Sequence, residues 1–76
     1  MNERRHADEM IRQLSPAERA ALQGLAAGES VSGLAQRLSV NEVVAADIRD
    51  CMKWRLGVRR DAEAVRIAHL AKLEMT

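Results

Sequence analysis

LAQRLSVNEVVAADI, residues 34–48, is the stretch that decides the fold of this chain. Its apolar residues recur where two steeply crossing helices share a core, and they are Leu34, Leu38, Val40, Ala45 and Ile48. Ala35 is small where the second helix would pass closest. Ser39 falls at the turn, where a left-handed backbone is wanted and serine is a weaker choice than glycine. This spacing predicts a helix-turn-helix, although any compact helical hairpin has a similar pattern.

The segment before this pair carries the signals of a helix start. Ser15 is expected at the N-cap, Pro16 at the first helical position and Glu18 three residues after the cap, where its carboxylate reaches back to the cap amide. One face of the helix then carries Leu14, Ala21, Leu22 and Leu25. Gly28 can take a positive φ and is expected to end this helix.

Further caps predict the remaining helices. Ser30 or Ser32 is expected to cap the first helix of the pair, and Asn41 the second. A final helix restarts after Gly57, with Asp61 near its N-terminus, where a carboxylate is favourable. No stretch is a strand candidate, so we expect an all-α chain.

Residues 1–13 are expected to form an N-terminal helical arm ahead of a domain that spans residues 14–76. Opposite charges recur one turn apart within residues 3–12, which supports a helix. Met10, Ile11 and Leu14 would hold the arm against the body. The alternative is a disordered leader.

The composition is that of one small soluble domain, since 47% of the 76 residues are apolar and 30% are charged. A net charge of +1 gives no large field that would draw the chain onto nucleic acid, so such binding would depend on local clusters of cations. Cys51 is the sole cysteine, which indicates a reducing cytoplasmic compartment and a thiol used for packing. No apolar run has the length of a signal peptide or membrane span.

No arrangement of residues indicates catalysis. His6 and His69 lie far apart without a motif around them, and Cys51 lacks an identifiable base. Metal-ligand spacing, phosphate loops and cofactor motifs are also missing from the sequence. We therefore expect no enzyme, no metal and no cofactor.

The stretch from Leu14 to Val65, LSPAERAALQGLAAGESVSGLAQRLSV…MKWRLGVRRDAEAV, resembles the C-terminal helix-turn-helix domain of the LuxR/FixJ/GerE class of bacterial transcription regulators. Its strongest parts are LSPAER, LAAGES with LAQRL behind it, and RLGVRRDAEAV. The resemblance implies a small four-helix domain that docks its third helix, about residues 42–56, in the major groove of double-stranded DNA and dimerises through its fourth, about residues 61–74. The length is similar to that of stand-alone members, which lack a sensor domain.

The periodicity of the third helix divides it into two sides. The side expected to face the body carries Ala45, Ile48, Arg49, Met52 and Leu56. The side expected to face outward carries Val43, Ala46, Asp47, Asp50 and Trp54. Any partner of this helix would meet that outward side.

The outward side departs from the family pattern. Members tend to carry a basic or polar residue at Val43, a threonine at Val44, a lysine at Ala46 and a histidine at Ile48, so this chain lacks those donors to bases and phosphates. Carboxylates such as Asp47 would in addition face a polyanion.

A cluster of cations offers some compensation. Arg55 matches the basic residue that the family carries before LGV, and further cations lie around it as phosphate contacts or as solvated charges. The candidates for contact with DNA are Arg37, Asn41, Val43, Val44, Ala46, Asp47, Arg49, Asp50, Lys53, Arg55, Arg59 and Arg60.

Trp54, the sole aromatic residue, has two interpretations. It packs against the fourth helix or the arm, or it is exposed and makes the outward side an apolar face dotted with acids, as in a hot spot for protein binding.

The fourth helix predicts a two-fold homodimer. Ala62, Val65 and Ala68 occupy one side of it, while the other side carries the interface candidates Ile67, Leu70 and Ala71. The alternative is that the N-terminal arm covers Leu70.

Two functions follow. The first is a dimeric bacterial transcription regulator that docks its third helix on DNA. The second is a transcription-regulatory protein that uses the face of Val43, Val44, Asp47, Asp50 and Trp54 to bind a protein of the transcription machinery, such as a transcription factor or sigma factor.

Overall fold

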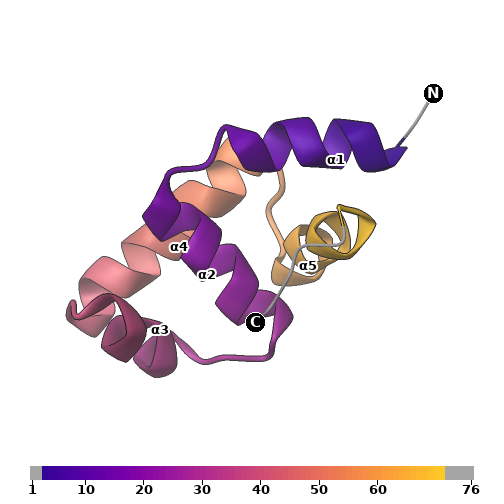
Figure 1. The fold of residues 1–76 in the computed structure, drawn as a ribbon. Coiled ribbons are helices and arrows are strands. Elements are labelled where there is room, and N and C mark those ends of the chain that lie inside the picture. Colours follow the sequence, from indigo (N-terminus) through magenta and orange to yellow (C-terminus); the bar gives the residue numbers. More distant parts are fainter. Residues whose placement is uncertain (1–2, 72–76) are drawn as a thin grey trace.

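The computed structural model describes residues 3–71, and side chains within residues 5–71. Over that range it contains helices and no strands, so the all-α expectation is confirmed. The helices are α1 (Glu3–Arg12), α2 (Pro16–Ala26), α3 (Val31–Leu38), α4 (Glu42–Leu56) and α5 (Asp61–Leu70), as Figure 1 shows. The end of the predicted final helix, residues 72–74, and the first two residues of the predicted arm lie outside the described residues.

The predicted start of α2 is confirmed in detail. The Ser15 hydroxyl accepts a hydrogen bond from the Glu18 backbone N–H at 3.1 Å, and the Glu18 carboxylate accepts one from the Ser15 N–H at 2.8 Å. Each side chain therefore satisfies an amide that the helix leaves without a partner. After α2 ends, Gly28 takes a φ of 82°, as its position predicts.

The α3–turn–α4 pair is also capped as its sequence predicts. Ser30, rather than Ser32, caps α3 by accepting from the Gly33 N–H at 3.1 Å, and Asn41 caps α4 by accepting from the Val44 N–H at 2.9 Å. Between the helices Ser39 adopts the left-handed conformation, with φ 57° and ψ 44°.

Two apolar clusters fill the interior. One lies among α2, α3 and α4, where Ala21, Leu34, Ala35 and Ala45 are buried and Val31, Leu38, Val40 and Ile48 pack against them. This cluster holds the residues that the opening stretch predicts for a shared core. The other lies among α1, α2, α4 and α5, and its buried members are Ile11, Leu14, Leu22, Met52, Leu56, Ala64 and Ala68.

The N-terminal arm is a helix that belongs to the body. In Figure 1, α1 runs across the top of the molecule above α5, and it contacts both α5 and α4. Ile11 and Leu14 are buried and Met10 packs against them, as expected. The interpretation of residues 3–12 as a disordered leader is therefore wrong.

The prediction for the sides of α5 needs a correction. Ala64 and Ala68 are the buried residues, whereas Ala62 is exposed. Ile67 and Ala71, assigned to a separate dimer side, pack against the second cluster. The reason is that α1 and α2 both contact α5, so the chain itself covers a wider arc of the helix than one neighbour could.

Candidate functional site

Helix α4 turns one side into the bundle and leaves the other to solvent. Ala45, Met52 and Leu56 are buried, and Ile48 and Arg49 are partly buried. The inward side predicted from the periodicity is thus confirmed. Contacts with α2 and α3 hold the helix in this orientation.

The opposite side forms what we call the outer face of α4: Val43, Asp47, Asp50, Cys51 and Trp54. Trp54 is 79% exposed and Val43 is 72% exposed, while the side chain of Asp50 is 74% exposed. Asp47 and Cys51 are also exposed. The face therefore presents two apolar side chains with two carboxylates between them along the helix.

Two expectations about this face are corrected. The packed interpretation of Trp54 is wrong, because the indole faces solvent instead of lying on α5 or α1. The thiol of Cys51 does not pack in the core either, since the residue is exposed. Both residues project from the side of α4 that lies away from α2 and α3.

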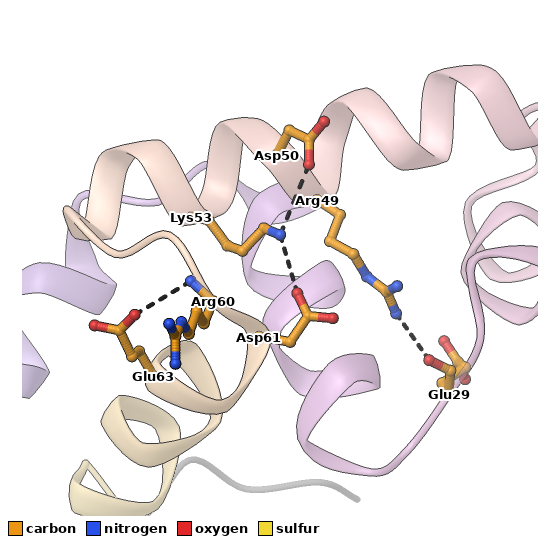
Figure 2. Close-up of polar contacts among 7 residues, drawn as sticks. All are labelled: Glu29, Arg49, Asp50, Lys53, Arg60, Asp61 and Glu63. Atoms are coloured by element: carbon orange, nitrogen blue, oxygen red, sulfur yellow. Dashed lines mark hydrogen bonds and ion pairs between the residues drawn. The ribbon is translucent and has the colours of Figure 1, made fainter.

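The cations of α4 are held by acceptors within the chain. Arg49 donates to the backbone carbonyl of Glu29 at 2.8 Å. The ammonium of Lys53 lies 3.0 Å from Asp61 and 3.8 Å from Asp50. Figure 2 shows both side chains extending toward the loop after α2 and the start of α5, whereas Asp50 lies on the far edge of the helix.

The third cation of α4, Arg55, pairs with the cap of α2. Its Nε donates to the Glu18 carboxylate at 2.8 Å. Burial by itself raises the pKa of Glu18, but hydrogen bonds from the Ser15 backbone and from Arg55 stabilise the charged form and outweigh burial, so the pKa lies below its usual value. One carboxylate therefore caps α2 and ties it to α4.

Glu29, in the loop between α2 and α3, holds two arginines. Its carboxylate accepts from Arg37 at 2.8 Å, and its carbonyl accepts from Arg49. The side chain fits because two glycines flank it: a Cβ at Gly24 would lie 2.6 Å from the Glu29 Oε1, and a Cβ at Gly33 would lie 2.7 Å from its Cγ. The Glu29 side chain thus occupies space that a Cβ at either glycine would enter.

Of the predicted cations, Arg59 and Arg60 are exposed and form no ion pair within the described residues. The backbone N–H of Arg60 donates to Glu63 at 3.3 Å and so helps to begin α5. Asn41 uses its side chain in the α4 cap, Val44 is 39% exposed and Ala46 is partly buried. The predicted DNA contacts thus do not share one environment: some are exposed cations, one caps a helix and others are apolar residues that are only partly exposed.

The dimer candidates lie beside a groove between α1 and α5. Ile67 and Leu70 line this groove of about 510 Å³, and Met10 and Val58 contribute further apolar surface. His6, Glu63 and Arg66 also line it. The arm therefore covers part of the surface that the sequence assigns to a second subunit.

Other kinds of site find little support among the described residues. No group of three histidine, cysteine or acidic side chains is arranged to hold a metal ion within residues 3–71. None of the helices described there has both the length and the apolar character needed to cross a membrane. The chain matches no family model, no curated protein and no solved structure in the comparisons with known proteins.

Sequence reasoning missed the partners of the cations. Arg49 lies 20 residues from Glu29, and Arg55 lies 37 residues from Glu18, so no local pattern links them. The exposure of Trp54 did have a signal, because the helical periodicity already places it beside Asp47 and Asp50 on the outward side.

Proposed function

We propose that this chain is a transcription-regulatory protein of the LuxR helix-turn-helix type, in which α3 and α4 form the helix-turn-helix and the outer face of α4 binds a protein partner. The single observation that supports this proposal is the separation of charge on α4. Asp47 and Asp50 are exposed between Val43 and Trp54, whereas the cations of α4 are engaged within the chain.

This arrangement disfavours a duplex as the ligand of the outer face. Affinity for DNA comes largely from cations that neutralise phosphates and release counterions. Arg37, Lys53 and Arg55 already lie against carboxylates that neutralise part of their charge, and Asp47 and Asp50 would remain opposite phosphates. A protein partner gains from the same face, because an exposed tryptophan beside an aliphatic residue resembles the centre of a protein-binding hot spot.

Docking on DNA remains the second candidate, favoured by Arg59 and Arg60. Both residues are exposed in the connection between α4 and α5, directly before α5 begins. In a dimer of the kind the family resemblance implies, two such pairs would add four cations to the contact with phosphates.

The two candidates are separated by measuring retention of genomic DNA fragments and capture of host proteins by the same immobilised chain. The proposal expects no DNA retention at low salt, and a captured protein that is lost with Asp47→Lys but kept with Glu9→Lys, a charge reversal at an exposed position on α1. DNA retention that weakens steeply with salt and strengthens with Asp47→Asn would contradict it.

A homodimer is a further part of the proposal. The groove between α1 and α5 offers Ile67 and Leu70 to a second subunit, away from the outer face of α4. Sedimentation velocity over a concentration series tests this arrangement, and Leu70→Glu should shift the protein toward the monomer. A monomer at every concentration would remove the dimer from the proposal.

A further inference from the structure

We infer that the partner bound by the outer face of α4 is a basic amphipathic helix, which places apolar side chains against Val43 and Trp54 and lysine or arginine side chains beside Asp47 and Asp50. This inference rests on the proposed function and adds the chemistry of the partner. The spacing, exposure and charge of the outer face support it.

The spacing of the outer face favours a helical partner. Val43, Asp47, Asp50 and Trp54 are separated by four, three and four residues, which is the alternation that places side chains along one seam between two packed helices. From Val43 to Trp54 the seam extends for about 17 Å at the rise of an α-helix. A partner helix of three or four turns would cover it.

The order of residues along the seam sets the chemistry of that helix. The ends of the seam are apolar and strongly exposed, so they favour aliphatic or aromatic side chains on the partner. The middle carries Asp47, which forms no ion pair within the described residues, and Asp50, which meets only Lys53 at 3.8 Å. Lysine or arginine at the two inner positions of the partner would form ion pairs with these carboxylates.

Charge also opposes a symmetric pairing of this face with the same face of a second copy. Two outer faces packed against each other would bring Asp47 and Asp50 of one copy toward the same carboxylates of the other, with apolar contact at the ends alone. Like charges in close contact oppose such an interface. Lys53 offsets only part of this repulsion, because its ammonium lies closer to Asp61, at 3.0 Å, than to Asp50, at 3.8 Å.

The test is selection of binders from a displayed library of 16-residue helical peptides in which the four seam positions are randomised. Binding is then measured by titration with the fluorescence of Trp54, the sole tryptophan, as the signal. We expect selected peptides to carry lysine or arginine at the inner two positions and apolar residues at the outer two. Their affinity should fall as salt rises.

Variants of the chain sharpen this test. Asp47→Asn combined with Asp50→Asn should weaken the selected peptides by roughly threefold to thirtyfold, the range expected for the loss of two partly solvated ion pairs. Glu9→Gln, which removes one exposed carboxylate on α1, should leave binding unchanged. Thermal unfolding of each variant establishes that the exposed substitutions preserve the fold.

The inference is overturned if selection yields no binder, if the inner positions are neutral or acidic, or if binding is insensitive to Asp47 and Asp50. Such a failure is distinct from failure of the proposed function. A native protein whose capture is lost with Asp47→Lys would keep the function and reject only the basic helix. Salt-dependent retention of DNA would reject the function itself.

Discussion

The contact between Glu18 and Arg55 gives the sharpest test of how this fold uses its cations. A double-mutant cycle with Glu18→Gln and Arg55→Met measures their coupling free energy, because neither substitution greatly alters side-chain volume. The Glu18 side chain is 8% exposed and that of Arg55 is 52% exposed, so solvent screens the pair from one side only. We expect a coupling of about 1 kcal/mol, at the upper end of exposed ion pairs.

Stability is measured by urea and thermal unfolding of all four proteins. A loss of about 1 kcal/mol in Arg55→Met corresponds to a fall in Tm of roughly 4–8 °C for a domain of this size. Glu18→Gln should lose more, because the carboxylate also accepts the Ser15 N–H at 2.8 Å. A coupling energy indistinguishable from zero would refute the idea that Arg55 stabilises the folded state through Glu18. Arg55 would then again be a candidate for contact with phosphates.

The same pair predicts a dependence on pH with a defined sign. The folded state lowers the pKa of Glu18, so the unfolded state takes up the proton at the higher pH. The stabilisation is therefore fully present above the ordinary glutamate value of 4.5 and is lost as pH falls below it through the folded pKa. The stability gap between the parent protein and Glu18→Gln should narrow over that range. A gap that widens toward acid would mean that the hydrogen bonds from Ser15 and Arg55 do not stabilise the charged carboxylate.

Three further substitutions test the packing and the outer face. Ser39→Gly should stabilise the protein by up to about 1 kcal/mol in urea unfolding, because it removes the Cβ from a left-handed residue, and a loss of stability would contradict this. Met52→Ala should cost about 2–5 kcal/mol by leaving a cavity where the side chain is fully buried, and a near-neutral effect would mean that the site collapses or that α4 is rotated. Trp54→Ala should change the free energy of unfolding by less than about 0.5 kcal/mol, since the exposed indole supports no core. A large decrease in that free energy would mean that Trp54 packs against the rest of the protein.

Helix boundaries could be predicted because their causes are local. Ser15, Asn41 and Gly57 each act within a few residues along the chain, through a side chain that accepts from the third amide or through a positive φ. The inward side of α4 could be predicted as well, since the burial of Ala45 and Met52 follows from periodicity alone. These features need no knowledge of where distant parts of the chain lie.

The tertiary structure decided where the long charged side chains end. Arg49 and Arg55 occupy ordinary positions on a helix, and an arginine tip reaches far enough from its Cα that several acceptors compete for it. Packing of α2 against α4 brings Glu18 to Arg55, and the loop after α2 brings the Glu29 carbonyl to Arg49. The sequence by itself therefore determined the helices from α2 onward, the caps of α2 and α4 and the carboxylates that face outward from α4, whereas the structure chose Ser30 as the cap of α3 and a helix for residues 3–12. Only the packing of segments 20 and 37 residues apart determined the partners of Arg49 and Arg55, because such contacts form only when the chain is folded.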